Sequence, residues 1–300
     1  VYAIVAHYDP LGLKSVNWST LLSCMAEVCQ DGVIVSTGIC DSDAQLARDK
    51  GFRVVIRENT GYDFMSYALG LAISKCAFPN TTRLVCNYSI YITNPALFTA
   101  SLWQLADWRP ANERNKAVKG GSFFRRRSGQ RVTFLTCATQ LMPHGQSYCF
   151  SIPPHVFNRQ MFQSFFQNIR PQASKLDIVF SYELGLTKLL NAMNEPWSAL
   201  YRPDPMTAVK PGFDGGVNPT HLCADEIIQR HGFIKIERLV KNPKQLKNSA
   251  TIQHYLQKYN NSIKSAPMTV KRSAPKAVVV CHCHYIEVID ELIETLDRVP

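Results

Sequence analysis

The sequence lacks the features that identify membrane-spanning, secreted and disordered proteins. In its 300 residues no apolar run approaches the roughly 20 residues that a membrane-spanning helix needs. The opening run, Val1-Tyr2-Ala3-Ile4-Val5-Ala6, is too short and too uncharged for a signal peptide. Because no methionine precedes it, we expect the chain to be a fragment of a longer protein. Hydrophobic residues make up 46% and charged residues 19%, which excludes the composition of disordered chains.

Cysteine is plentiful, but the spacings of a metal or redox site are missing. None of the ten cysteines forms a C-x-x-C pair, and most lie in apolar segments such as Leu84-Val85-Cys86. This pattern predicts buried free thiols in a reducing compartment. Cys281-His282-Cys283-His284 looks like a metal cluster, but on a strand the cysteines face one side and the histidines the other. We therefore predict a strand there. The Gly-x-Ser-x-Gly elbow of serine hydrolases is also absent.

Acidic residues are fewer than basic ones. The 33 Lys and Arg against 23 Asp and Glu leave a net charge of +10. The densest basic cluster is Arg125-Arg126-Arg127, followed by Arg131. A solvated loop is the favoured interpretation, and a surface for anionic lipid or an anionic nucleotide sugar is the alternative. No nucleic-acid-binding motif accompanies this charge, so we expect no nucleic acid partner.

Strand-like and helix-like segments alternate through the first third of the chain. β-branched apolar runs predict strands at 1–6, 32–37, 52–56 and 83–86, and apolar spacing predicts helices at 18–29, 41–50 and 64–77. Asp41 or Ser42 is the expected cap of the second helix. This alternation predicts an α/β fold with a mostly parallel sheet and helices on both faces. Farther on we expect a strand at 132–136, another ending at 152, mostly loop at 196–219, and helices at 156–170, 175–193 and 220–231.

The composition changes near the end of the chain. Residues 262–275 are rich in Ser, Pro, Lys and Arg, which predicts a linker. Residues 277–285 then repeat the pattern of 3–8, an apolar strand that runs into His-Tyr, before an expected helix at 286–296. We therefore predict one domain over 1–261, a linker over 262–275, and the start of a truncated second α/β domain over 276–300.

Three polar groups follow strands of the predicted parallel sheet, where ligands of such sheets bind. They are His7-Tyr8-Asp9, Arg57-Glu58-Asn59 and Asn87-Tyr88-Ser89. The second group continues into the densest polar cluster, residues 57–64. A turn with Gly61 at positive φ and Asp63 as a helix cap explains part of it. Arg57 and Asn59 suit phosphate oxygens and a base or ribose edge.

The cluster Arg57-Glu58-Asn59-Thr60-Gly61-Tyr62-Asp63-Phe64 resembles a signature of the rhamnan synthesis protein F family of bacterial glycosyltransferases. Further segments resemble that family in the same order, over roughly residues 1 to 245. They are His7-Tyr8-Asp9, Asn87-Tyr88-Ser89, His144-Gly145-Gln146-Ser147-Tyr148, Tyr182-Glu183 with Thr187, Asn218-Pro219-Thr220-His221, Gly232-Phe233-Ile234-Lys235 and Asn242-Pro243. The resemblance implies a GT-A-like, Rossmann-like fold and transfer of a sugar, often rhamnose, onto a growing surface polysaccharide.

The resemblance also implies roles for the matching residues. A donor site would contain His7, Tyr8, Asp9, Arg57, Glu58, Asn59, Gly61, Tyr62, Asp63, Asn87 and Ser89, and the transfer site Gln146, Ser147, Tyr148 and Thr187. Transfer with inversion needs a base for the acceptor hydroxyl. Glu183, His144 and Asp107 are the candidates, and the resemblance favours Glu183.

The chain departs from the family at Tyr88. The family has an aspartate there, a reduced form of the Asp-x-Asp motif that holds a divalent metal in many GT-A enzymes, whereas a phenol is a poor ligand for such an ion. We therefore expect no metal cofactor. Tyr88 and Ser89 would donate hydrogen bonds to phosphate while Lys or Arg side chains neutralise the diphosphate; alternatively, Tyr88 packs against the sheet and the pocket is inactive. The literal Asp41-Ser42-Asp43 opens a helix and predicts a helix start instead of a metal site.

These expectations combine into one functional hypothesis with one alternative. The hypothesis is a cytoplasmic glycosyltransferase of rhamnan or O-antigen lipopolysaccharide assembly, peripheral to the inner face of the cell membrane. Its donor would be dTDP-rhamnose and its acceptor a lipid-linked polysaccharide. The alternative is a non-catalytic glycosyltransferase-like module that binds nucleotide or glycan and positions an active domain after residue 276.

Overall fold

The first half of the central sheet is parallel. The computed structural model describes residues 1–9, 15–106, 131–172, 174–204 and 216–265. Strands β3 (Phe52–Ile56), β2 (Asp31–Ser36), β1 (Tyr2–His7) and β4 (Arg83–Asn87) lie side by side in that order. Helices α1 (Ser15–Val28), α2 (Asp41–Asp49) and α3 (Tyr62–Ala77) connect them. All four strands therefore end at one edge of the sheet.

The second half of the sheet is mixed. Strand β8 (Cys149–Ile152) pairs antiparallel with β4 and with β6 (Val132–Ala138). Strand β6 also pairs antiparallel with β7 (His144–Gly145) and parallel with β9 (Trp197–Tyr201). Because β8 runs against β4, its first residues reach the edge where the parallel strands end. The predicted α/β class with a mostly parallel sheet is confirmed.

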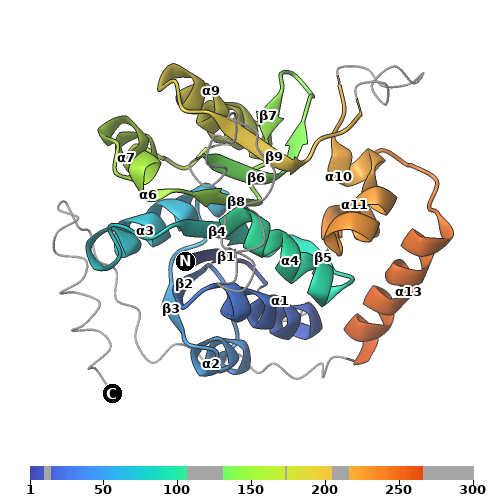
Figure 1. Cartoon of the computed structure of the whole chain (residues 1–300). Coiled ribbons are helices and arrows are strands. Elements are labelled where there is room, and N and C mark those ends of the chain that lie inside the picture. The colour runs from blue at the N-terminus through green and yellow to red at the C-terminus, as the bar shows by residue number, and fades with distance from the viewer. Residues whose placement is uncertain (10–14, 107–130, 173, 205–215, 266–300) are drawn as a thin grey trace, which may run out of the picture.

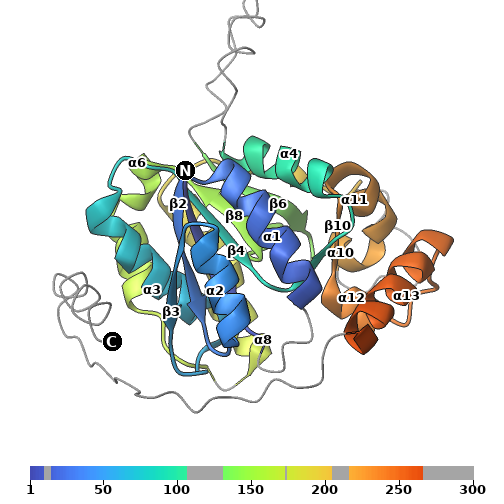
Figure 2. The same ribbon diagram turned by 90° about the horizontal axis from the view of Figure 1, so that it is seen from below.

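Helices cover both faces of the sheet, as the alternation predicted. Figure 1 shows α1 and α2 on one side, and α7 (Gln160–Gln167) and α9 (Leu184–Ala192) on the other. Figure 2 shows α4 (Pro95–Ala106) beside α1. Along β1, Ala3 and Val5 face the first side, whereas Ile4 and Ala6 face the second. Both β1 faces are fully apolar because parallel strands inside such a sheet are buried on both sides.

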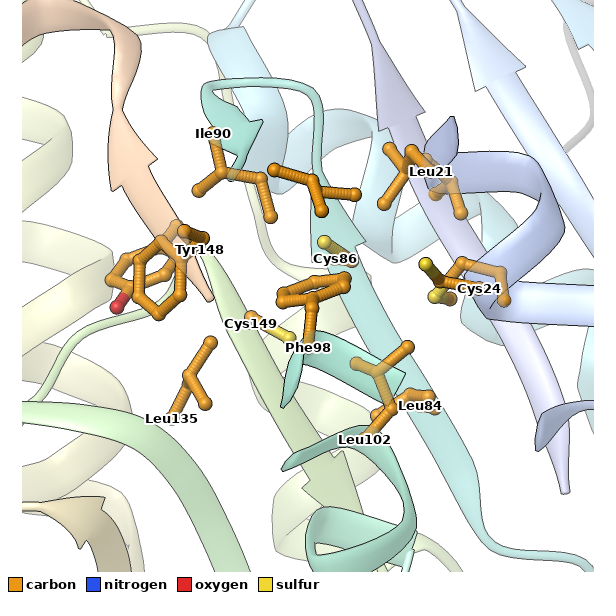
Figure 3. Packing of buried hydrophobic residues seen from close by; sticks show 14 of the residues in the cluster. Leu21, Cys24, Leu84, Cys86, Ile90, Phe98, Leu102, Leu135, Tyr148 and Cys149 are labelled. Atoms are coloured by element: carbon orange, nitrogen blue, oxygen red, sulfur yellow. The ribbon is translucent and has the colours of Figure 1, made fainter. Parts of the chain in front are cut away.

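The core under α1 and α4 contains thiols among aliphatic and aromatic side chains. Figure 3 shows Cys24 of α1, Cys86 of β4 and Cys149 of β8 in this cluster. Cys86 and Cys149 are opposite each other on their strands, and both are fully buried. All cysteines whose state the structure describes are free, and most are buried, which confirms that part of the thiol prediction.

A small third layer closes the structure on the side of α4. Strand β5 (Ile90–Ile92) pairs antiparallel with β10 (Phe233–Lys235). Helices α11 (Ala224–His231), α12 (Ile236–Val240) and α13 (Ala250–Ser265) pack around this ribbon. The turn into β10 uses Gly232 at φ 68°, which ends α11 as the sequence predicted. This ribbon determines which residues of the late chain reach the end of β4.

Several local expectations were wrong. Residues 197–201, expected as loop, form β9, because no proline interrupts the chain between positions 196 and 203. The helix expected over 156–170 is two helices, α6 (Pro154–Phe157) and α7, separated at 158–159. Helix α2 begins after Cys40, so Asp41 is its first residue and neither expected residue is its N-cap.

The helix expected over 175–193 is present, with one irregular turn. It consists of α8 (Lys175–Ile178), a π-helical turn (Val179–Glu183) and α9. Isolated π turns are rare and often lie at functional sites, and this one ends on Glu183.

The predicted domain division is only partly within the described residues. Helix α13 continues to Ser265, so the first four residues of the predicted linker are helical, which is possible because the next proline is Pro267. The rest of the linker, the second domain with its Cys-His segment, and the cluster Arg125–Arg127 lie outside the described residues.

Candidate functional site

Arg57 organises the loop that follows β3. Its guanidinium donates to Ser66 Oγ at 2.9 Å and to the carbonyl oxygens of Glu58, Thr60 and Tyr62 at 2.8, 2.6 and 2.6 Å. The loop therefore wraps around a cation that is anchored to α3. Burial lowers the pKa of Arg57, and the nearby Asp63 opposes that shift. Because most of its N–H groups are used, shaping the loop is the role observed for Arg57, and phosphate contact stays a prediction.

The loop enters α3 through two left-handed residues. Gly61 has φ 66°, as predicted, and Tyr62 has φ 55°, which a residue with a side chain rarely adopts. Gly61 is the N-cap of α3, so Asp63 lies in the first turn and is not the predicted cap. Glu58, Asn59 and Tyr62 present their side chains to solvent. Among the described residues, the Glu58 carbonyl contacts Arg57 and Thr60, and contact of the Glu58 and Asn59 side chains with a ligand stays a prediction.

The residues at the end of β1 are mostly buried. His7 Nδ1 lies 3.0 Å from Ser36 Oγ, and the His7 ring stacks on Tyr88 with centroids 5.0 Å apart. Asp9 is also buried, whereas Tyr8 is exposed. Of these three predicted donor-site residues, Tyr8 alone presents a side chain that a ligand can cover. Contact of the donor with His7 and Asp9 stays a prediction.

Tyr88 packs in the core. It is 3% exposed, and its ring packs against both His7 and Trp18, with centroids 5.0 and 5.1 Å away. Burial raises the pKa of its phenol, so it is neutral. The expectation that Tyr88 donates a hydrogen bond to the diphosphate is therefore wrong, because the aromatic contacts hold the ring on the opposite side of the strand from Asn87 and Ser89. The other interpretation, that Tyr88 packs against the sheet, describes its position.

A chain of polar side chains lies at the end of β4. Asn87 Nδ2 donates to Asp63 Oδ2 at 2.6 Å, and Asn87 Oδ1 accepts from the backbone N–H of Ser89 at 3.2 Å and from its hydroxyl. Lys235 Nζ in turn donates to Ser89 Oγ. The structure thus joins three predicted donor-site residues to a lysine from the far end of the chain.

The sequence reasoning did not assign Lys235 to the site. Lys235 ends β10, whose pairing with β5 sets it opposite Ile90. Its ammonium also lies 4.2 Å from the centroid of the Tyr148 ring, a cation–π distance. A basic residue in the closing motif that resembles the family was the one available signal.

The two candidate catalytic residues lie next to each other. Glu183 Oε2 accepts from the Ser147 backbone N–H at 3.0 Å and from its hydroxyl at 2.6 Å. Glu183 Oε1 lies 3.4 Å from His144 Nε2. His144 Nδ1 lies 2.8 Å from the Met142 carbonyl, which can only accept, so Nδ1 carries a proton. Glu183 and His144 therefore contact each other, and Glu183 also binds Ser147 in the connection between β7 and β8.

The charges of this pair follow from those contacts. Burial works to raise the pKa of Glu183, but hydrogen bonds from His144 and Ser147 outweigh it, so the pKa lies below its usual value. Burial works to lower the pKa of His144, but its hydrogen bonds to Glu183 and the Met142 carbonyl raise it. The structure thus favours a carboxylate beside an imidazolium.

The predicted transfer-site residues are joined by buried hydrogen bonds. Thr136 Oγ1 lies 2.7 Å from both Gln146 Oε1 and the Tyr148 hydroxyl, and Gln146 Nε2 donates to Asn218 Oδ1 at 3.2 Å. The Gly145 backbone N–H donates to Thr187 Oγ1 at 3.2 Å. Thr136 and Asn218 were not assigned to the site. This network fixes the segment that carries His144 and Ser147.

The donor half and the transfer half meet at one backbone contact. Asn87 N–H donates to the Tyr148 carbonyl at 2.8 Å, where β4 and β8 begin to pair. Tyr67 of α3 also donates to the Ser147 carbonyl at 3.0 Å. The predicted residues from Asp63 to Glu183 therefore form one continuous site. Asp107, the third base candidate, lies outside the described residues.

The polar side chains joined at the end of β4 are a poor set of ligands for a divalent metal ion. They supply one carboxylate, Asp63, one amide and one hydroxyl, and the Lys235 ammonium contacts that hydroxyl. Hard divalent ions prefer several carboxylate or carbonyl oxygens, and a cation in contact with a ligand atom repels them. Within the described residues, no group of three or more His, Cys, Asp or Glu is arranged to hold a metal.

Two solved structures show what the fold resembles. The chain is similar to the glycosyltransferase GlyE in Streptococcus pneumoniae TIGR4, with 9% identity over 87% of this chain and 62% of that chain, at a TM-score of 0.40. It is also similar to a protein of Desulfovibrio desulfuricans G20 described as a nucleotide-diphospho-sugar transferase, with 9% identity over 85% of this chain and 97% of that chain, at a TM-score of 0.35. At these values the likeness identifies no substrate and no site residue.

The sequence comparisons give a more definite result. No curated protein matches the chain. The family model of rhamnan synthesis protein F matches residues 33–262, which is more than half of the chain and includes the site from Arg57 to Lys235. The chain belongs to the rhamnan synthesis protein F family.

Proposed function

We propose that this protein is a glycosyltransferase that moves rhamnose from dTDP-rhamnose to a growing bacterial surface polysaccharide. Family membership supports the reaction class. The observation that carries the proposal is the junction of β4 and β8, where Asn87 and its partner Asp63 adjoin Ser147 and Glu183. A nucleotide sugar bound at the end of β4 would present its anomeric carbon to the Glu183 carboxylate.

Glu183 is the proposed base. For transfer with inversion, the acceptor hydroxyl gives its proton to the carboxylate while its oxygen bonds to the anomeric carbon. The bond from that carbon to the diphosphate oxygen breaks, and the nucleoside diphosphate leaves with the electron pair. The Glu183 side chain is 20% exposed and the His144 side chain 5%, so of this pair Glu183 is the one that an acceptor can reach.

His144 is the proposed positioning residue. Both of its ring nitrogens face acceptors of the protein, the Met142 carbonyl and Glu183 Oε1. It therefore holds the Glu183 carboxylate ionised and in place, and has no ring nitrogen left to contact the hydroxyl of the acceptor glycan. Ser147 fixes the other carboxylate oxygen through two hydrogen bonds, so Oε1 is the oxygen proposed to take the proton.

The proposed acceptor is a lipid-linked polysaccharide at the cytoplasmic face of the cell membrane. Within the described residues, no helix is both long enough and apolar enough to span a membrane. The net charge of +10 supports peripheral attraction to anionic lipid. Vesicle flotation would test this: binding to vesicles with anionic lipid and not to neutral vesicles is expected, whereas no binding to either would contradict it.

The donor assignment is tested by calorimetry on the whole chain in EDTA and in Mn²⁺. We expect dTDP-rhamnose to bind more tightly than UDP-glucose or GDP-mannose, and to release dTDP when a lipid-linked glycan acceptor is added. Absence of binding by any of these nucleotide sugars, with or without the metal ion, would refute the proposed function. Tight binding of another donor alone would refute the assignment of rhamnose.

The alternative, a non-catalytic module that positions a downstream domain, is favoured by one observation. Tyr88 fills the core where the family carries a carboxylate, so this copy lacks one acid of the donor site. Donor binding without any turnover with several acceptors would support the module.

A further inference from the structure

We propose that Lys235 and Ser89 bind the diphosphate of the donor and stabilise the departing nucleoside diphosphate, so that an ammonium takes the place of a divalent metal ion. This inference rests on the proposed function and names the groups of that same site that meet the phosphates. Its chemistry is that of a cation placed where negative charge grows as the sugar is transferred.

The position of Lys235 is determined by backbone pairing. Strand β10 pairs with β5, and the Ile236 N–H donates to the Ser89 carbonyl at 2.9 Å. The Lys235 ammonium therefore reaches the Ser89 hydroxyl, directly after the end of β4. In a parallel α/β sheet this is the edge where ligands bind. Ser89, Asp63 and Lys235 are each partly exposed.

The ammonium lacks a carboxylate partner at short range. Among the described residues, no ion pair within 4.0 Å includes Lys235, whose contacts are the Ser89 hydroxyl and the Tyr148 ring. An ammonium has three N–H donors, and one hydroxyl acceptor satisfies one of them. A half-buried, incompletely paired cation costs free energy, and an anion that supplies the missing acceptors would remove that cost. Two phosphate groups offer several such oxygens.

Charged groups face Lys235 from several elements. Asp63 of α3 and Glu183 at the end of the π turn act on it as anions, together with the Cys86 thiol, while Lys175 of α8 opposes them. Farther out, His221 and Glu237 also interact with it. Burial lowers the pKa of Lys235 to about 8, although the two carboxylates act to raise it. The lysine is therefore mostly charged at pH 7 and mostly neutral at pH 9.

The test compares dTDP with thymidine, which has the same base and sugar but no phosphate. Binding is measured by calorimetry on the whole chain in EDTA, for the wild type, Lys235→Met, Lys235→Arg and the control Lys241→Met, which replaces an exposed lysine directly after α12. Lys235→Met should weaken dTDP binding about ten- to hundredfold, the effect of losing a charge-assisted hydrogen bond. Thymidine binding should not change, and Lys241→Met should bind both as the wild type does.

A pH series supplies a second test, and its wild-type part does not depend on the folding of a variant. Between pH 7 and pH 9 the wild type should lose affinity for dTDP about tenfold, and Lys235→Arg should not, because arginine stays charged. The terminal phosphate, with a second pKa of about 6, keeps its charge over this range.

The outcomes separate this inference from the proposed function. No binding of dTDP, UDP or GDP by the wild type would refute both. Wild-type binding that Lys235→Met retains in full would refute the role of Lys235 and leave the proposed function intact. Binding that requires added Mn²⁺ would refute the replacement of the metal by an ammonium.

Discussion

Replacing Glu183 with glutamine separates its chemical role from its structural one. In Glu183→Gln the amide oxygen can accept both hydrogen bonds from Ser147, and the amide nitrogen can donate to a neutral His144 at Nε2. Each polar atom of the pair keeps a partner, so we expect the fold to persist. The variant loses the negative charge and the ability to take a proton from the acceptor.

The magnitudes follow from these contacts. The two charge-assisted hydrogen bonds from Ser147, each worth about 1.5–3 kcal/mol, become neutral ones worth about 0.5–1.5 kcal/mol, and the contact with His144 becomes neutral as well. The free energy of unfolding at pH 7 should therefore fall by about 1–3 kcal/mol. Turnover should fall by about 10²- to 10⁴-fold if Glu183 is the base, while donor affinity stays near the wild-type value. The pKa of His144 should also fall, because its anionic partner is lost.

The assays are release of dTDP with a lipid-linked acceptor, calorimetry for the donor, urea unfolding, and NMR titration of His144. Glu195→Gln is the matched control, since Glu195 is likewise a carboxylate beside a histidine, His155, but follows the end of α9 opposite to the one that Glu183 precedes. Its turnover should not change. Wild-type turnover in folded Glu183→Gln would refute the base assignment, and an inactive His144→Ala that still binds donor would then transfer it to His144.

Three further predictions concern the shape and charge of the site. Arg57→Ala should weaken nucleotide binding about ten- to hundredfold in calorimetry and expose the following loop to protease; unchanged affinity would contradict this. Gly145→Ala should cost about 1–3 kcal/mol in urea unfolding, because its Cβ would lie 2.2 Å from an aromatic ring of β6; Gly185→Ala, with its nearest contact at 3.4 Å, is the control. The wild type should exceed Glu183→Gln in stability most between about pH 4.5 and 6.5. The pKa of Glu183 is lowered in the folded state, so this group stabilises the fold above its unfolded pKa, and that stabilisation is lost as the pH falls. The pKa of His144 is raised in the folded state, so this group stabilises the fold below its unfolded pKa, and that stabilisation is lost as the pH rises. A constant difference from pH 3 to pH 9 would refute this.

The fold was predictable where local pattern and tertiary context agree. Residues 52–56 form β3 with the bounds expected, because a short β-branched run between Gly51 and Arg57 has few other solutions. Residues 197–201 were not predictable in this way, because a strand of five residues beside several prolines is stabilised by its partner β6 and not by its own pattern. The ribbon of β5 and β10 was not predictable for the same reason, because each strand has only three residues and is stabilised by pairing with the other.

The anionic and amide groups of the site were predictable from strand order. Parallel strands end at one edge, so Asn87 and the residues after β3 lie at the same edge, and Asp63 reaches Asn87 from α3, after the loop that Arg57 shapes. What strand order cannot give is which way a side chain is held. Tyr88 directly follows Asn87, yet its ring is in the core, because successive residues of a strand face opposite sides and His7 and Trp18 offer an aromatic surface there.

The cation of the site was missed for a reason of topology. Lys235 is 146 residues from Ser89 in the chain, and a single lysine after a three-residue apolar strand has no pattern of its own. Its position depends on the antiparallel register that sets it opposite Ile90, and register is decided by which side chains pack under the ribbon. Under the proposed role of Lys235, the ammonium at Ser89 and the neutral, buried Tyr88 both limit the negative charge that a diphosphate would meet at the end of β4.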